Sequence, residues 1–252
     1  PVTRSGGVAS IISLSIFFYI YYLLYGKVLY NYIFISYSVF IVGFLDDLRI
    51  KIKPMNRLVI MLSLLFIFIY ILPIKILNID IPFLIYLMSS HMFSSIFVLL
   101  CFLFVINGAN LIDGFNGLLT INLIIINIIL TYINMNNENL EFSILIISQI
   151  IILLSFLLFN FPNAKIFLGD SGAYTMGALV GLNTIITNNL NPTISSFFFC
   201  TLLFYLFFEV FFSFLRKILQ NKSPIYPDDK HLHMLSFYKI STSHGKDKGN
   251  YL

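Results

Sequence analysis

Residues 93–133 read FSSIFVLLCFLFVI-NGANLIDGFNGL-LTINLIIINIILTYI, two apolar runs separated by one polar stretch. A helix needs about 20 apolar residues to cross the hydrocarbon core of a membrane, which is about 30 Å thick. The runs 91–106 and 118–133 approach that length, so we interpret them as consecutive membrane spans. The polar stretch 107–117 then lies at one membrane surface, where an Asn or an acid recurs at every third position.

The rest of the chain has the same apolar character. Its 252 residues are 59% hydrophobic and 10% charged, whereas a soluble domain carries roughly 25% charged residues. Mean hydropathy is +0.93. These values exclude an ordinary soluble domain and indicate an all-α polytopic membrane protein, with residues 1–252 forming a single transmembrane domain. We predict about eight transmembrane helices: 8–25, 28–45, 58–74, 91–106, 118–133, 142–159, 172–188 and 194–215.

The basic residues divide unequally between the two faces of such a bundle. If the spans alternate in direction, Lys27 and Lys75 fall on one face, which leaves 13 of the 15 Lys and Arg residues on the other. Basic residues are enriched in cytoplasmic loops, so the second face is predicted to be cytoplasmic. Its segments are 1–7, 46–57, 107–117, 160–171 and 216–252.

Most of the acids beside span ends lie on the same predicted face. They occur in the stretches GFLDD, NGANLIDGFNGL and FLGDSGAY, and a fourth stretch, PDDKHLHM, adds two histidines. The candidate site residues in these stretches are Asp46, Asp47, Asp113, Asp170, His231 and His233, and Glu209 is close by.

Each stretch also has an ordinary reading of its own. Asp46 and Asp47 can be interfacial acids balanced by nearby basic residues, Asp170 a helix N-cap, and the histidines part of a solvated tail. Acids near a membrane are costly, however, and tend to mark function. Because several clusters converge on one face, we interpret them as one site.

Residue spacing and chemistry suggest what such a site binds. Positions three apart lie about 60° apart around an α-helix, so we expect Asn110 and Asp113 to face a shared cavity, with Asn116 turned elsewhere. Carboxylate and amide oxygens suit Mg²⁺ or Mn²⁺. Turns flanked by glycine at helix starts bind anions, and Arg57 and Lys165 add positive charge. The residues therefore predict a site for a metal ion and a phosphorylated substrate, beside a membrane lipid.

The segments PVTRSGGVA, GFLDD, NGANLIDGFNGL, FLGDSGAYTMG and PDDKHLHM resemble, in this order, those of the polyprenyl-phosphate N-acetylhexosamine-1-phosphate transferase family. The resemblance runs over essentially the whole chain. It implies a Mg²⁺-dependent enzyme that transfers a sugar-1-phosphate, expected to be GlcNAc-1-phosphate, from a UDP-N-acetylhexosamine to polyprenyl (undecaprenyl) phosphate. UMP is released, and the product begins the synthesis of a cell-envelope glycan such as cell wall or lipopolysaccharide.

The resemblance also implies a location and partners. We expect a multi-pass protein of the inner membrane of a bacterium, with its active site on the cytoplasmic face. The two substrates and the membrane are the expected partners, together with a second copy of the chain as one alternative. No nucleic acid is expected.

Residue roles follow from the same resemblance, position by position. Asp46, Asp47 and Asp113 correspond to catalytic positions, the first two near the lipid phosphate and the third near the metal and the diphosphate. Asn110 and Asp170 correspond to the metal ligands. The substrate-binding positions are Asn107, Asn116, which reads uracil, Arg57, which binds phosphate, and His231 and His233, which cover the sugar diphosphate.

The chain departs from the family pattern in several places. Met234 stands where relatives have a third His, and the run of three His after Pro found in the MurNAc-pentapeptide branch is absent, which favours a small UDP-N-acetylhexosamine donor. Glu209 stands where Asp is common. The sequence begins without Met and stops before the last spans of its relatives, so we expect truncation at both ends and ten or eleven spans in the intact protein. A transporter for an anionic solute and an inactive relative of the transferase remain alternatives.

Overall fold

The computed structural model describes residues 2–48, 50, 52–223 and 230–244. These residues form eleven helices and no β-strand, and Thr3 and Ile166 make one isolated parallel bridge. The prediction of an all-α protein is confirmed. The helices are α1 (Gly6–Tyr25), α2 (Tyr30–Asp47), α3 (Pro54–Ile71), α4 (Pro82–Met88), α5 (His91–Ile112), α6 (Leu118–Asn136), α7 (Leu140–Asn160), α8 (Gly169–Leu190), α9 (Ser196–Leu202), α10 (Phe204–Leu219) and α11 (Leu232–His244).

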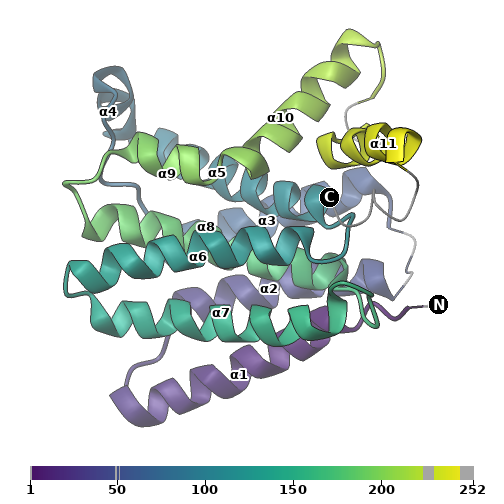
Figure 1. The fold of residues 1–252 in the computed structure, drawn as a ribbon. Helices are drawn as coiled ribbons and strands as arrows, with labels where there is room; N and C mark the ends of the chain where they lie inside the picture. The colour runs from purple at the N-terminus through teal and green to yellow at the C-terminus, as the bar shows by residue number, and fades with distance from the viewer. Residues whose placement is uncertain (1, 49, 51, 224–229, 245–252) are drawn as a thin grey trace.

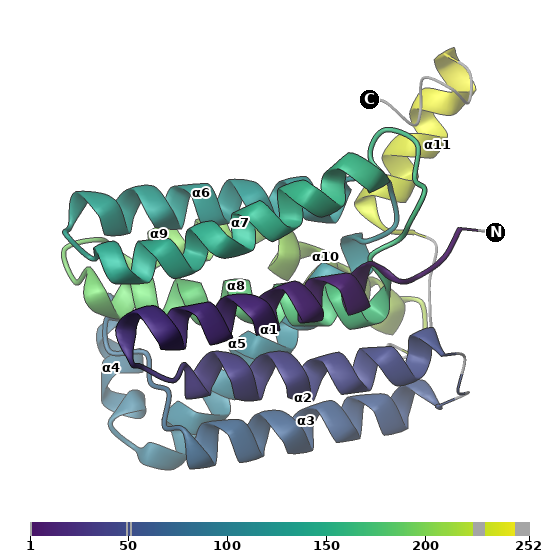
Figure 2. The same cartoon turned by 90° about the horizontal axis from the view of Figure 1, so that it is seen from below.

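Among the described residues, five helices are long and apolar enough to cross a membrane, namely α1, α3, α5, α6 and α7. A sixth candidate is the pair formed by α9 and α10, which is bent by 69°. The predicted spans 28–45 and 172–188 appear as α2 and α8, which run alongside the others (Figure 2) but are less apolar. The polytopic membrane fold is therefore confirmed, while length and composition support five or six of the eight predicted spans.

Helix α8 is less apolar because it lies inside the bundle. It packs against α1, α2, α5 and α6, and all but four of its 22 residues are buried. Small and polar residues suit such a position, since small residues let helices approach and polar ones hydrogen-bond across them. Asn183, for example, accepts from the hydroxyl of Tyr32 at 2.8 Å and donates to Gln149 at 2.8 Å.

The polar segments predicted to share a face do lie at one end of the bundle. In Figures 1 and 2 the N-terminal segment, the connections α2–α3, α5–α6 and α7–α8, and helix α11 all gather at the same end, on the right of each view. This grouping brings segments that are far apart in sequence into contact, as the site geometry shows.

Several predicted boundaries were wrong. Helix α5 continues to Ile112, so the span does not end at residue 106, and the short helix α4 was not predicted. The apolar run 194–215 is broken at Leu203, where α9 ends and α10 leaves the bundle at an angle (Figure 1). The end of the stretch PDDKHLHM is helical, because α11 begins at Leu232.

Candidate functional site

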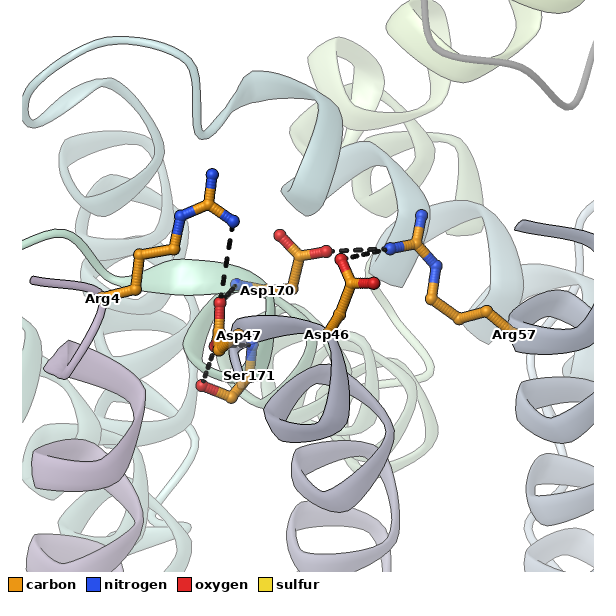
Figure 3. Close-up of polar contacts among 6 residues, drawn as sticks. All are labelled: Arg4, Asp46, Asp47, Arg57, Asp170 and Ser171. Carbon is orange, nitrogen blue, oxygen red and sulfur yellow. Dashed lines mark hydrogen bonds and ion pairs between the residues drawn. The ribbon is translucent and has the colours of Figure 1, made fainter. Parts of the chain in front are cut away.

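Asp47, in the last turn of α2, caps the N-terminus of α8. Its Oδ1 atom accepts a hydrogen bond of 3.0 Å from the backbone N–H of Asp170 (Figure 3). Its Oδ2 atom accepts from the backbone N–H of Ser171 at 3.0 Å and from the Ser171 hydroxyl at 2.6 Å. The N-cap residue of α8 itself, Leu168, has no side-chain oxygen for this purpose. Asp47 therefore satisfies free backbone donors and adds negative charge where the helix dipole favours it.

Two glycines make this close approach of α2 and α8 possible. Gly169 has a φ of +77°, and a Cβ atom there would lie 2.6 Å from Oδ2 of Asp47. A Cβ atom on Gly43, one turn before the acids of α2, would lie 2.4 Å from the backbone nitrogen of Ser171. The role of Gly43 was not predicted, because its neighbour lies on a distant segment of the chain.

Asp46 and Asp170 share one cation. The Nη1 atom of Arg57, on α3, donates to Oδ2 of Asp46 and to Oδ2 of Asp170, both at 2.9 Å (Figure 3). The two carboxylate oxygens are thus at most about 5.8 Å apart, twice 2.9 Å. The Arg57 guanidinium also lies 5.8 Å from the ring centroid of Tyr174. The side chains of Arg57, Asp46 and Asp170 are 27%, 29% and 18% exposed, so this part of the cluster is open to a ligand.

Asp113, directly after α5, adds a fourth acid to this end of the bundle, beside Asp46, Asp47 and Asp170. Its pKa is raised to about 8, mainly by burial and further by the negative charges of Asp170 and Asp47, while Arg4 opposes the shift. Arg4 also lies 4.0 Å from Oδ1 of Asp47. The segment before α1, the end of α2, the start of α8 and the end of α5 therefore form one electrostatic unit.

A cavity of about 470 Å³ adjoins this cluster. Arg57, Asn107, Asn110 and Tyr174 contribute polar groups to its wall, and most of the remaining lining is apolar. Because α5 continues past residue 106, Asn107 and Asn110 line this cavity together, and Asp113 is not in its wall. A cavity shared by Asn110 and Asp113 stays a prediction. Asn107 also donates to the carbonyl of Leu103 at 2.7 Å. The apolar part of the wall comes from α3, α5 and α10 and includes Leu58, Met61, Leu100, Leu103, Phe104, Val210, Phe211 and Phe214.

The loop between α5 and α6 is tied to the loop between α7 and α8. Asn116 donates to the carbonyl of Pro162 at 2.9 Å. Asn160, which is buried, accepts from the backbone N–H of Gly117 at 2.6 Å and donates to the carbonyl of Ile166 at 2.9 Å. Asn160 was missed from the sequence, where a single polar residue after the apolar run LLF was its only signal. Lys165 is exposed in the same loop, and its predicted role in phosphate binding stays a prediction.

His231 and His233 lie at the same end of the bundle. Their rings stack with centroids 5.7 Å apart, and both side chains are largely buried against Glu209 of α10. His231 lies directly before α11 and His233 within it. Their role in covering the sugar diphosphate stays a prediction. The PDD part of the motif, residues 227–229, lies outside the described residues.

The donor set at this end suits a divalent metal ion that arrives with a phosphate. Within the described ranges, no group of three or more His, Cys, Asp or Glu side chains is arranged to hold a metal ion by itself. Mg²⁺, however, is usually bound by one or two carboxylates together with substrate phosphates and water. Asp46 and Asp170, whose oxygens converge on one point, supply that number of carboxylates. Asn110 stays a predicted ligand.

Comparison with known proteins shows that this chain is similar to the members of one family. The sequence model of glycosyl transferase family 4 matches residues 28–188. The undecaprenyl-phosphate alpha-N-acetylglucosaminyl 1-phosphate transferase of Thermotoga maritima is 31% identical over 146 residues, which cover 58% of this chain and 44% of the relative. The phospho-N-acetylmuramoyl-pentapeptide-transferase of Streptococcus agalactiae serotype Ia is 32% identical over 154 residues, covering 58% and 45%.

A third relative, the phospho-N-acetylmuramoyl-pentapeptide-transferase of Leuconostoc mesenteroides, is 41% identical over 80 residues, which cover 32% of this chain and 25% of the relative. The matches therefore span less than half the length of these three curated relatives. The range matched by the family includes Asp46, Asp47, Arg57, Asp113 and Asp170, whereas His231 and His233 lie beyond it.

Proposed function

The chain belongs to glycosyl transferase family 4, and on that premise we propose that it transfers a sugar-1-phosphate from a UDP-N-acetylhexosamine to a polyprenyl phosphate, with release of UMP. The proposed donor is UDP-GlcNAc and the proposed acceptor is undecaprenyl phosphate. The reaction would be the first lipid-linked step in making a cell-envelope glycan. The unequal distribution of basic residues supports an active site on the cytoplasmic face of a bacterial inner membrane.

The observation that carries this proposal is the position of Arg57. Its guanidinium belongs both to the cluster with Asp46 and Asp170 and to the wall of the largely apolar cavity. A lipid acceptor has an anionic head group and a long apolar chain. Its binding site therefore needs a cation next to an apolar surface, as Arg57 and the cavity provide. Ligand sites of this kind are mostly apolar, with a few polar groups that fix orientation.

The transfer reaction requires little covalent catalysis by the protein. An oxygen of the lipid phosphate attacks the phosphorus that carries the sugar, so that a new P–O bond forms, and the P–O bond to UMP breaks. A phosphate monoester has its second pKa near 6, so the attacking oxygen is already largely ionised at neutral pH. Positioning and electrostatic stabilisation can then supply most of the rate enhancement.

Individual residues support these two tasks. Arg57 is placed to bind a phosphate oxygen, and Asp46 and Asp170 would hold Mg²⁺ beside the diphosphate. The metal ion, when bound, neutralises charge on the phosphate oxygens and orients them. Asp47 has its oxygens engaged by Asp170 and Ser171, so we assign it the positioning of Asp170 in preference to proton transfer.

Two observations bear on the choice among rival functions. The acids lie at one end of the bundle, whereas a transporter for an anionic solute needs polar groups near the membrane midplane, with interrupted helices around them. The single His–Leu–His–Met sequence, without a run of three His, supports a small UDP-N-acetylhexosamine over a MurNAc-pentapeptide donor.

The proposal is tested by incubating the purified chain with Mg²⁺, undecaprenyl phosphate and one sugar nucleotide, and measuring UMP release. We expect release with UDP-GlcNAc, dependence on the lipid phosphate, and loss of release in EDTA. Release with UDP-MurNAc-pentapeptide alone would move the chain to the other branch of the family. No release with either donor would contradict the proposed function.

A further inference from the structure

We propose that Glu209 of α10 is a positioning residue that holds His231 and His233 against the loop between α5 and α6. The proposal rests on the proposed function, because that loop contains two predicted site residues, Asp113 and Asn116. Nothing in the family match covers Glu209, which lies beyond residue 188.

Glu209 is a buried carboxylate that meets the histidine segment with both oxygens. The residue is 1% exposed. Its Oε2 atom lies 3.2 Å from Nδ1 of His231, and its Oε1 atom accepts from the backbone N–H of Leu232 at 3.0 Å. Oε1 also lies 3.7 Å from Nδ1 of His233. Burying a carboxylate is costly unless it is paired and hydrogen-bonded, so these contacts hold the segment in place.

The same contacts determine which ring nitrogen of each histidine faces the carboxylate. A carboxylate that faces Nδ1 favours a proton on that nitrogen, and so leaves Nε2 of the ring for other partners. Leu232 is the first residue of α11, so the carboxylate also satisfies a free N–H at the start of that helix, where negative charge is favoured. One side chain of α10 therefore hydrogen-bonds the ring of His231 and the first residue of α11, and it faces Nδ1 of His233 at the longer distance of 3.7 Å.

The far side of His233 contacts the α5–α6 loop. A Cβ atom on Gly114 would lie 2.8 Å from Nε2 of His233, and the His233 ring makes an edge contact with Phe115 at 5.5 Å between centroids. The histidine pair is thus held between Glu209 on one side and Gly114 on the other. If the carboxylate is removed, the rings keep their contacts with the loop but lose their acidic partner.

The first experiment measures donor kinetics for Glu209→Gln and Glu209→Asp. Gln keeps the size but places an N–H₂ group where Nδ1–H needs an acceptor, whereas Asp keeps the charge. Losing a charge-assisted hydrogen bond corresponds to about a 10- to 100-fold lower kcat/KM for the sugar nucleotide. We expect that loss for Gln, partial rescue by Asp, and an unchanged KM for undecaprenyl phosphate. Glu138→Gln, in an exposed loop at the other end of the bundle, is the matched control.

The second experiment does not depend on activity. Carbethoxylation by diethyl pyrocarbonate, followed by mass spectrometry, reports how accessible each histidine is. We expect Glu209→Gln to raise the modification rates of His231 and His233 severalfold, while the rate at His91, which is exposed at the opposite end of the bundle, stays constant. If the wild-type chain releases no UMP, the proposed function fails, and this readout still decides whether Glu209 anchors the histidines.

Gly114→Ala perturbs His233 from its other side and supplies a third measurement. In the wild-type background the added methyl group should lower kcat/KM for the donor. In Glu209→Gln the further loss should be smaller, because two changes that displace the same group are not additive. Full additivity, unchanged modification of both histidines, or faster modification with unchanged donor kinetics would each overturn the positioning role.

Discussion

The carboxylate of Asp47 and the backbone N–H of Asp170 are joined by a hydrogen bond of 3.0 Å across 123 positions of the sequence. Because this bond uses the backbone of Asp170, the Asp170 side chain stays available to face Arg57 and Asp46. The two acids joined by this contact therefore have different surroundings: Asp47 fixes the start of α8, and the side chain of Asp170 pairs with Arg57.

Replacing Asp47 by Ala should destabilise the fold as well as the site. The change removes three hydrogen bonds at the N-terminus of α8, and loss of an N-cap side chain costs about 0.5–2 kcal/mol. We expect a lower unfolding temperature in detergent together with lower turnover, and a milder effect for Asp47→Asn. Asp80→Ala, which removes contacts to Ser195 and Ser196 at the other end of the bundle, should lower stability and leave UMP release per folded molecule unchanged.

Asp170→Asn should lower turnover strongly and change the stability of the fold little. The backbone N–H that Asp47 binds is retained, so the unfolding temperature should change little, while the charge shared with Arg57 is lost. If Asp170 binds Mg²⁺ with the substrate, turnover should fall by orders of magnitude, on the order of 100-fold or more, as expected when an electrostatic contact to the reacting phosphates is removed. Near-normal UMP release at ordinary Mg²⁺ concentration, with insertion into the membrane intact, would remove Asp170 from the metal site.

Asp113 should make the stability of the protein depend on pH. Its pKa is about 8 in the folded chain and 3.8 in the reference state, so between these values the folded state retains a proton that the unfolded state has lost. Stability from this group is present below about pH 4 and is lost as the pH rises through 8, with a slope of at most about 1.4 kcal/mol per pH unit.

Thermal unfolding in EDTA, measured from pH 5 to 9, checks this sign. Asp113→Asn cannot titrate, so its unfolding temperature should fall less with rising pH than that of the wild type, and the variant should be the more stable of the two near pH 8. Parallel profiles for the two proteins would show that Asp113 does not carry the dependence.

Local sequence predicted the helices far better than their contacts. Runs such as 118–133 are apolar throughout, which is sufficient to predict a buried or membrane-spanning helix, and alternation of such helices places Asp46, Asp113 and Asp170 at one end. The break at Leu203 was not predictable in this way, because residues 194–215 contain neither Pro nor Gly to signal it.

The roles of Gly43 and Asn160 illustrate the same limit within the site. Each is an ordinary residue of its own helix, and each becomes important through a partner on another segment, Ser171 for Gly43 and Gly117 for Asn160. Spacing along one helix cannot reveal such contacts. The end of α5 likewise decides which side chains enter the cavity, so that Asn107 and Asn110 line it.

Single cysteine probes test the arrangement on which the site depends. Cys101 and Cys200 are the two native cysteines and would first be replaced by Ala or Ser. Asn56, Ser223 and Asn137 are all exposed, the first two at the end of the bundle that holds the acids and the third at the opposite end.

Because the basic residues favour a cytoplasmic location for the acidic end, cysteines at 56 and 223 should react with an impermeant maleimide only from the cytoplasmic side. A cysteine at 137 should react from outside intact cells. Labelling of positions 56 and 137 from the same side would contradict the number of crossings between α3 and α6, and with it the convergence of Asp46, Asp113 and Asp170 on one membrane face.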